Sequence, residues 1–333
     1  MKKNLKIRFE DVDRGKNGLS KQPEFFVELL SRKYNVTVLN GGSEEPDVLF
    51  FSCWGEANVK WTRCLRIYFS GERFYPDFNM CDYAVGLTNI GTSDRFFRFP
   101  HYVFYNGVLR KYENMQPDAD AFRLVNREFC SAVVTDPYRS PIFFDIFNRL
   151  SEYKPVASGG GWNNTVGGPV PDKLEFIKNY KFNIAFENII ADNYVTEKIV
   201  EALAARTVPI YWGSSSVKRE FGEGSYINIL DFDTIDRAID YIKKVDNDDE
   251  LYMQILCRRA QMPYTYDEWC DRLLDFLYNA IESDNRIFDS RLNYVYNKKY
   301  NYYLMHTSLI GTMYKKYKRT LYSLQDLWRK IIR

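Results

Sequence analysis

The sequence has few of the residues that hold metals or cross-link a small fold. Among its 333 residues there are only two His, and the six Cys include no C-x-x-C pair. Zinc sites and disulfide frameworks need clustered Cys or His, so we expect neither, and reduced thiols fit a cytosol. No apolar run reaches the length of a membrane span, and the first residues, MKKNLKIRFEDVD, lack the apolar core of a signal peptide. The sequence therefore predicts a cytoplasmic protein.

Charge is nearly balanced overall but unevenly distributed. The net charge is +2, yet residues 291–333 hold ten Lys or Arg against the single acid Asp326. That segment therefore carries +9 and the remaining residues carry −7. A basic tail on an acidic body favours an anionic surface as the partner of the tail.

The tail also has a helical pattern. Apolar and aromatic residues recur every three or four positions between residues 310 and 331, and Lys and Arg occupy the other faces. This predicts a basic amphipathic helix, which could lie on an anionic membrane, self-associate as a coiled coil or pack back on the body. Peripheral binding to the inner membrane face would follow from the first alternative. The continuous apolar face disfavours a nucleic-acid partner.

The body alternates short apolar strands with helical stretches. Strands are expected at 5–9, 36–39, 47–51, 65–69 and 82–86, with a helix over 23–34, and strands again at 182–186, 208–212 and 226–230. Helices are expected at 195–206, 235–244, 248–260 and 266–283. Aromatic residues make up 17% of the chain, an excess expected mainly in its cores. The alternation predicts an α/β fold of two doubly wound domains with a cleft between them.

A Pro- and Gly-rich stretch over residues 136–168 suggests the junction between these domains. We therefore expect an N-terminal domain over residues 1–153 and a C-terminal domain over 154–288. The basic tail then covers residues 289–333.

One helix start combines three kinds of polar group. In the stretch FENIIADNYVTEKIVEALAARTVPIYWG (186–213), Tyr194, Glu197 and Lys198 cluster at the start of the helix expected at 195–206, with Asp192 or Asn193 as its N-cap. Backbone N–H groups and a lysine at a helix N-terminus favour a phosphate. Glu197 would repel phosphate but could accept hydrogen bonds from ribose hydroxyls. The three groups together fit a nucleotide diphosphate sugar, although an ordinary surface helix could carry the same residues.

Three further stretches fit such a site. Arg139 stands before an amphipathic helix, where a guanidinium could clamp a diphosphate or form a surface ion pair. The loop SGGGWNNTVGG (158–168) has glycines where the backbone must approach something closely, unless it is a flexible linker. Glu72 follows the strand expected at 65–69 and is placed either for general-base duty or as a solvated turn carboxylate.

These motifs resemble those of the bacterial α-1,3-fucosyltransferases of glycosyltransferase family 10. The resemblance is carried by F-E-N, Y-V-T-E-K and P-I-Y-W-G within residues 180–217, and by SGER, SDRFFRFP (93–100), the SGGG loop and YINILDFDTIDRAIDYI (226–242). It covers most of residues 65–245 and implies a GT-B fold and inverting transfer of L-fucose from GDP-β-L-fucose. The implied product is an α-1,3 linkage to GlcNAc in an N-acetyllactosamine-type acceptor glycan, as in Lewis antigens on cell-surface lipopolysaccharide.

The resemblance also implies roles for individual residues. It makes Glu72 the general base and puts donor binding on a set of six residues, which are Arg139, Tyr194, Glu197, Lys198, Glu187 and Asn188. Because Arg139 and Lys198 are cationic, no metal is required. The D-x-D string at Asp231 and Asp233 is better explained by Asp233 as a helix N-cap. Two alternatives stay open: a transferase of other donor or acceptor specificity, and a non-catalytic nucleotide- or glycan-binding module.

Overall fold

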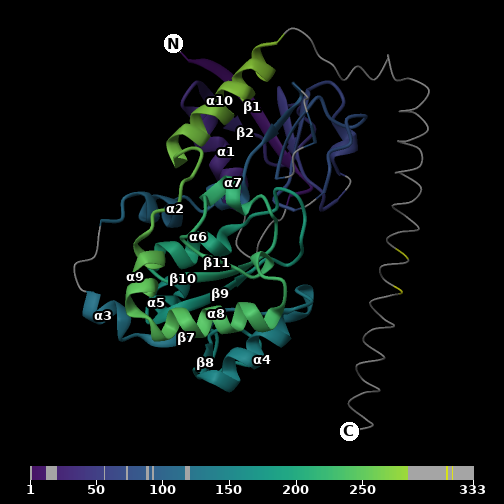
Figure 1. The fold of residues 1–333 in the computed structure, drawn as a ribbon. Helices are drawn as coiled ribbons and strands as arrows, with labels where there is room; N and C mark the ends of the chain where they lie inside the picture. The colour runs from purple at the N-terminus through teal and green to yellow at the C-terminus, as the bar shows by residue number, and fades with distance from the viewer. Residues whose placement is uncertain are drawn as a thin grey trace. The chain divides into compact units, whose positions relative to one another are not determined.

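The computed structural model describes residues 2–12, 21–55, 57–72, 74–87, 90–91, 94–116 and 121–283, together with Met313 and Tyr317. They fall in two compact units (Figure 1). The first unit lies within Met1–Ser70, Pro76–Val85 and Leu277–Arg333, and the second within Gly71–Tyr75 and Gly86–Phe276. Each contains a parallel sheet with helices, which confirms the predicted α/β class.

The first sheet has the strand order β2-β1-β3-β4-β5-β6. Its strands are β1 (Lys3–Glu10), β2 (Tyr34–Val38), β3 (Val48–Phe51), β4 (Leu65–Phe69), β5 (Tyr83–Gly86) and β6 (Phe96–Arg98). The pairings from β2 through β5 are all parallel. β3 and β4 are buried along their whole length, as expected for a parallel sheet covered on both faces.

The direction of winding reverses at β1. The chain passes from β1 through α1 (Lys21–Ser31) to β2 on one side, and β3 then pairs with the other side of β1. Between β3 and β4 lies the 3-10 helix η1 (Ala57–Lys60). The core of this unit confirms the expected use of aromatics, because ring centroids 4.9–6.4 Å apart link Phe9, Phe26, Phe50 and Phe69.

The second sheet has the strand order β11-β10-β9-β7-β8. Its strands are β7 (Glu128–Ala132), β8 (Val156–Ser158), β9 (Tyr180–Phe186), β10 (Val208–Trp212) and β11 (Ile227–Asn228), and all pairings are parallel. The chain leaves β7 toward β8 but leaves β9 toward β10. The winding therefore reverses between the neighbouring strands β7 and β9.

Helices cover both faces of this second sheet. α4 (Phe143–Tyr153), α8 (Ile235–Asn247) and α9 (Asp249–Cys257) share one core cluster with Phe182, Ile184 and Phe186 of β9. α6 (Glu197–Ala204) contacts β9 and β10, and Figure 1 shows it across the sheet from α8. The other helical segments are η2 (His101–Phe104), α2 (Asn106–Glu113), α3 (Ala121–Val125), η3 (Pro137–Arg139), α5 (Lys173–Ile177), α7 (Val217–Phe221), η4 (Ile229–Asp231) and α10 (Tyr266–Glu282).

The domain boundary expected after residue 153 differs from this division. β7 and α4 lie before that boundary, yet β7 pairs with β9 from Glu128 beside Tyr180 onward. The Pro- and Gly-rich stretch over 136–168 is therefore no linker between units. It contains η3, α4 and β8 together with the loops that follow β7 and β8, where prolines and glycines shape turns within one sheet.

α8 begins at Ile235, as the sequence predicts, but its N-cap differs from the predicted one. Thr234, and not Asp233, is its N-cap, with a side chain that accepts a hydrogen bond from the Arg237 N–H. Asp233 instead pairs with the Arg237 guanidinium at 3.2 Å. The helix thus begins one residue later than an Asp233 cap would place it.

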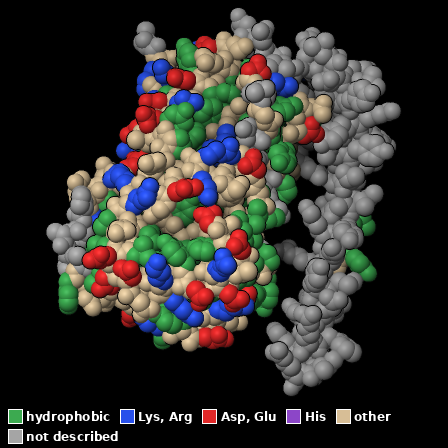
Figure 2. Space-filling view, in the orientation of Figure 1, with side chains coloured by type: hydrophobic (Ala, Val, Ile, Leu, Met, Phe, Trp, Pro, Cys, Tyr) green, Lys and Arg blue, Asp and Glu red, His purple; other side chains and the backbone are tan. Residues whose placement is uncertain are grey.

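The predicted tail over 289–333, with its helix between 310 and 331, lies outside the described residues except for Met313 and Tyr317. Within the described part of the chain, no helix has the length and apolar character to span a membrane. On the face that Figure 2 presents, the described acidic and basic side chains are interspersed without a large area of one sign. This face therefore lacks the broad basic patch typical of nucleic-acid binding.

Candidate active site

Glu187 fixes the loop between β9 and α6. It directly follows β9, and its N–H donates to the Trp212 carbonyl at 2.8 Å. Its fully buried carboxylate accepts from the Thr196 N–H and from the Thr196 hydroxyl, each at 2.7 Å. A carboxylate that caps both groups of one residue pins the loop at the point where α6 begins.

This contact corrects the predicted N-cap of α6. The helix begins at Glu197 with Thr196 as its N-cap, so neither Asp192 nor Asn193 caps it. Asn193 has a φ of 58°, in the left-handed region that turns the chain before the helix. Because Glu187 holds Thr196, the helix starts later than expected and Tyr194 lies in the preceding loop.

Lys198 projects from the first turn of α6 into a ring of acceptors. Its Nζ lies 2.9 Å from the Thr196 hydroxyl, 3.3 Å from Glu187 Oε2 and 3.4 Å from Glu197 Oε1. Burial alone would lower the pKa of Lys198, but the Glu187 and Glu197 carboxylates hold that pKa above its usual value. The lysine therefore stays charged and is fixed in position before any ligand arrives.

Glu197 is held ionised by its own neighbours. His101 Nδ1, from η2, lies 3.2 Å from Glu197 Oε2. Burial alone would raise the pKa of Glu197, but the His101 hydrogen bond and the Lys198 charge hold that pKa well below its ordinary range. His101 was not predicted as a site residue, since nothing local in the sequence links it to Glu197.

A cavity of about 400 Å³ opens beside these groups. Its walls come from the segment after β7, the starts of α4, α5 and α6, and the end of β9 with the residues that follow it. The lining residues are Val133, Val134, Thr135, Asp136, Pro137, Ser140, Phe143, Lys173, Asn183, Ile184, Phe186, Glu187, Asn188, Glu197 and Lys198. It therefore lies at the carboxyl ends of β7 and β9, where the winding of the sheet reverses. Open α/β sheets bind their ligands at such a switch point, and the volume suits a small-molecule ligand.

Comparison with known proteins decides the family. The FucT N-terminal domain of α-(1,3)-fucosyltransferases matches residues 7–105, and the C-terminal domain of glycosyltransferase family 10 (fucosyltransferase) matches residues 129–276. Together they cover about three quarters of the chain. The chain belongs to glycosyltransferase family 10.

Individual relatives agree with this family. The α-(1,3)-fucosyltransferase FucT of Helicobacter pylori is 32% identical over 262 residues, which are 68% of this chain and 54% of that protein. The α-(1,3)-fucosyltransferase C of Drosophila melanogaster is 33% identical over 37% of this chain and 30% of its own length. This family 10 chain therefore spans about half of the length of the first of these relatives and less than a third of the length of the second.

Solved structures match over more of their length. A crystal structure of an α1,3-fucosyltransferase with GDP-fucose is 27% identical, with a TM-score of 0.70 over 87% of this chain and 94% of that one. Another α1,3-fucosyltransferase structure is 28% identical, with a TM-score of 0.73 over 86% and 93%. The two-sheet architecture is thus the GT-B architecture of the family 10 fucosyltransferases.

The structure brings together four of the seven site residues predicted for this family 10 chain. Glu187, Asn188, Glu197 and Lys198 all line the switch-point cavity. Arg139 ends η3, next to the lining residue Ser140, and its side chain lies outside the described part of the chain.

Tyr194 and Glu72 are not lining residues, but the Glu72 charge acts on the Tyr194 hydroxyl. Burial raises the pKa of the Tyr194 hydroxyl to about 12, Lys198 opposes that shift, and the Glu187 and Glu72 carboxylates add to it. Glu72 is exposed in the turn after β4, as is the neighbouring ring of Phe74. The turn thus presents a carboxylate to solvent within electrostatic range of the α6 loop.

Ser140 is a further site residue that the sequence did not indicate. It is 6% exposed, lines the cavity, and its hydroxyl has no hydrogen-bond partner within the described residues. A buried hydroxyl without a partner costs free energy unless a ligand supplies one. Ser140 is therefore a candidate donor to a bound group.

No three His, Cys, Asp or Glu of the described ranges gather in a way that could hold a metal ion. Of the D-x-D string at 231–233, Asp231 accepts from the Asn228 amide at 3.0 Å and pairs with Lys218 at 3.2 Å. These contacts give Asp231 a structural role.

Proposed function

We propose that this chain is an inverting α-1,3-fucosyltransferase that transfers L-fucose from GDP-β-L-fucose to a hydroxyl of GlcNAc in an N-acetyllactosamine-type glycan. One observation carries the proposal: the switch-point cavity of the second sheet combines a fixed lysine and an ionised carboxylate at a helix N-terminus, in a chain of the fucosyltransferase family. The crystal structure of an α1,3-fucosyltransferase with GDP-fucose supports the choice of donor.

The proposed donor site uses two kinds of contact. Lys198, Arg139 and the first N–H groups of α6 bind the diphosphate, because a helix N-terminus and cationic side chains both favour anions. Glu197 accepts hydrogen bonds from ribose hydroxyls, and its low pKa keeps it an acceptor at neutral pH. Asn188 and Ser140 supply further polar contacts from the cavity wall.

Glu187 acts indirectly in this proposal. It is fully buried and its carboxylate is engaged by Thr196 and Lys198. We assign it the role of a positioning residue that fixes the α6 N-terminus and the lysine.

The proposed reaction is a single displacement. Glu72 takes the proton from the acceptor hydroxyl as its oxygen attacks the anomeric carbon of fucose, while the bond to the GDP oxygen breaks on the opposite face. The carbon is inverted because no covalent intermediate forms. Negative charge grows on the departing diphosphate, where Lys198, Arg139 and the helix N-terminus stabilise it. The proposal assigns the donor to the second unit and the acceptor to the first.

A donor panel tests this function. Purified protein is offered GDP-fucose, GDP-mannose and UDP-sugars, each with and without Galβ1-4GlcNAc, and nucleotide release and glycan product are measured. We expect release from GDP-fucose alone among the donors, with a product carrying an α-1,3-linked fucose. Release from another donor would favour a transferase of different specificity, and GDP binding without product would favour a non-catalytic module.

The glycine loop gives a test of the donor site with its own control. A Cβ on Gly160 would meet the Val134 carbonyl oxygen at 2.1 Å, whereas a Cβ on Gly161 would meet Thr135 Cγ2 at 3.4 Å, an ordinary contact. Val134 and Thr135 both line the cavity. Overpacking of this kind costs about 1–3 kcal/mol, so Gly160→Ala should displace the segment after β7.

We expect Gly160→Ala to weaken GDP-fucose binding about tenfold in calorimetry, because overpacking by about 1–3 kcal/mol displaces part of the cavity wall. Gly161→Ala serves as the matched control and should bind as the wild type does. Equal affinities for the two variants would show that the close approach at Gly160 does not shape the donor site.

A further inference from the structure

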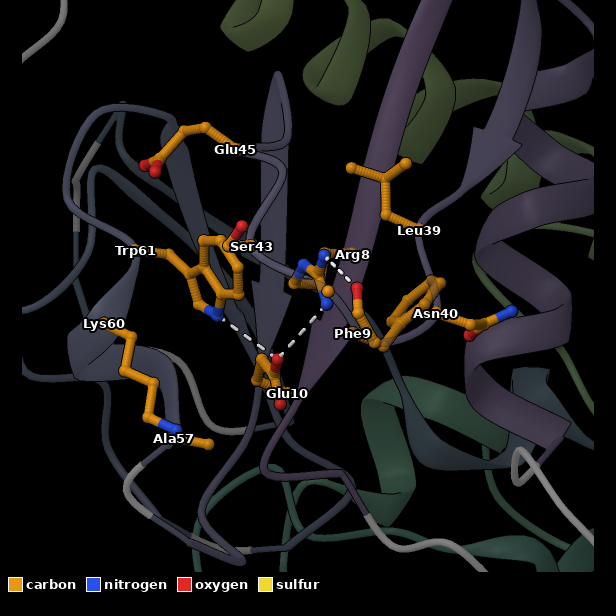
Figure 3. A pocket seen from close by; sticks show the side chains of 12 residues that line it. Arg8, Phe9, Glu10, Leu39, Asn40, Ser43, Glu45, Ala57, Lys60 and Trp61 are labelled. Atoms are coloured by element: carbon orange, nitrogen blue, oxygen red, sulfur yellow. Dashed lines mark hydrogen bonds and ion pairs between the residues drawn. The ribbon is translucent and has the colours of Figure 1, made fainter.

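A second cavity, of about 750 Å³, opens in the first unit (Figure 3). Its walls come from the end of β1 at Arg8–Glu10, the segment after β2 at residues 39–45, and η1 with the following Trp61. These segments meet at the carboxyl ends of β1 and β2. β1 is the strand at which this sheet changes its winding direction, so the cavity occupies the ligand position of an open α/β sheet.

A buried charged pair forms one side of this cavity. The Arg8 side chain is only 3% exposed, and its guanidinium lies 4.1 Å from the centroid of the Trp61 ring. The Trp61 indole N–H donates to Glu10 Oε1 at 3.2 Å, and Arg8 Nη1 lies 3.8 Å from the same oxygen. Figure 3 shows these three side chains pointing toward one another, so the Glu10 carboxylate is held in a fixed orientation.

Arg8 uses only part of its hydrogen-bonding capacity. Nη2 donates to the Gly41 carbonyl at 2.8 Å and to the Glu44 carbonyl at 3.3 Å, which holds the segment after β2. Nε has no hydrogen-bond partner among the described residues. A guanidinium can donate five hydrogen bonds in a planar fork, so this one keeps capacity beyond its structural contacts.

The charges in the cavity point to the class of ligand. Its ionisable lining residues are two cations, Arg8 and Lys60, and two anions, Glu10 and Glu45. A balanced set gives no net attraction for an anion such as a nucleotide phosphate. A fixed carboxylate and guanidinium beside aromatic carbon, with an amide at the rim, are instead suited to vicinal hydroxyls on a neutral ring, since sites combine apolar walls with a few oriented polar groups.

We propose that this cavity binds a neutral sugar unit of the acceptor glycan, with Glu10 accepting hydrogen bonds from its hydroxyls and Asn40 and Lys60 contacting it from the rim. The choice of an acceptor sugar rests on the proposed transferase function. The cavity itself does not, because its geometry belongs to the first unit alone.

Binding of a glycan, measured without turnover, tests the proposal. The probes are Galβ1-4GlcNAc and its sialylated counterpart, and saturation-transfer NMR and calorimetry on the full chain report their affinities. The variants are Glu10→Gln, which preserves shape, and Asn40→Ala, whose side chain is exposed so that folding is not at stake. The matched control is Glu44→Gln, because Glu44 pairs with Lys6 at 2.6 Å and does not line the cavity.

We expect Glu10→Gln to weaken binding of the neutral disaccharide about tenfold, the scale of a hydrogen bond to a charged group. Asn40→Ala should weaken it a few-fold, while Glu44→Gln should bind as the wild type does. GDP-fucose affinity should be unchanged in all three variants, and the melting temperature should be unchanged for Asn40→Ala and Glu44→Gln. Because Glu10→Gln weakens a buried pair with Arg8, its binding is measured well below its own melting temperature. The sialylated probe should bind more weakly than the neutral one.

Three results would overturn the proposal: no glycan binding by the wild type, equal affinities for Glu10→Gln and Glu44→Gln, or tighter binding of the sialylated probe. Failure of the transferase function would look different. In that case, glycan binding would still depend on Glu10 although no donor is consumed.

Discussion

Replacing Glu72 by Gln should reduce the turnover of GDP-fucose with acceptor by about 10²- to 10⁴-fold, the usual contribution of a general base. The amide has nearly the shape of the carboxylate but cannot take the acceptor proton. Because Glu72 is exposed and lies outside the lining of the donor cavity, GDP-fucose affinity should stay at the wild-type value. The melting temperature should also be unchanged, since exposed substitutions rarely alter stability by more than about 0.5 kcal/mol.

Stopped assays of fucosylated product and calorimetry with GDP-fucose measure the two effects separately. Asp77→Asn is the matched control, because Asp77 is another exposed acid of the same turn and its side chain accepts from the Asn79 N–H at 2.9 Å. It should keep full turnover. A Glu72→Gln enzyme that turns over within about threefold of the wild type would remove Glu72 from the role of base, since a general base contributes far more.

Two strands of the second sheet, β9 and β10, were predictable because each is a continuous run of apolar residues. β10 has the predicted bounds and β9 extends its predicted range by two residues, since buried parallel strands appear in a sequence as continuous runs of apolar residues. β7 and β8 were missed. β7 reads EFCSA and β8 has three residues, so neither carries enough β-branched or apolar residues to stand out from a loop. Without these strands, the sequence analysis assigned residues up to 153 to the N-terminal domain. The structural division instead places β7 and α4 in the second unit.

Local motifs singled out four residues that line the cavity, but they did not show how those residues contact one another. Glu197 and Lys198 are adjacent in sequence, and Glu187 precedes them by one loop, so their grouping follows from strand–loop–helix geometry. Besides the adjacent Lys198, Glu197 contacts His101, which is 96 positions away. Such a contact depends on tertiary packing, and no local spacing encodes it.

The glycine loop shows the same limit. Its sequence indicated a close backbone approach, and Gly160 confirms one, but the partner is the backbone of Val134 and not a ligand. The run of glycines indicates that a side chain would not fit in this loop. Only the fold identifies Val134 as the neighbour that excludes it.

Replacing Lys198 by Ala should weaken GDP-fucose binding and destabilise the protein, and the two effects have different causes. Loss of a charge-assisted hydrogen bond to the diphosphate costs about 1.5–3 kcal/mol, or about 10- to 150-fold in affinity. Removal of one partner of a buried ion pair costs about 3–5 kcal/mol of folding free energy, because Glu187 is fully buried and its Oε2 lies 3.3 Å from the lysine. Calorimetry measures the first effect and denaturant unfolding measures the second.

The pH dependence of unfolding identifies Glu187 as the source of the instability. Burial raises the pKa of Glu187, and loss of the opposing Lys198 charge raises that pKa further. The folded state then binds a proton more readily than the unfolded state, so its stability falls as pH rises above the ordinary Glu value of 4.5. The stability deficit of Lys198→Ala should therefore grow as pH rises above that value, by at most about 1.4 kcal/mol for each pH unit.

A double variant separates the two effects. Glu187→Gln removes the stranded charge, so Glu187→Gln/Lys198→Ala should recover most of the lost stability while donor affinity stays low. Lys178→Ala, which removes an exposed lysine paired with Glu175, should change neither quantity. If the double variant regained GDP-fucose affinity together with stability, Lys198 would serve the fold and not the phosphate, and the donor site would have to rest on Arg139 and the α6 N-terminus alone.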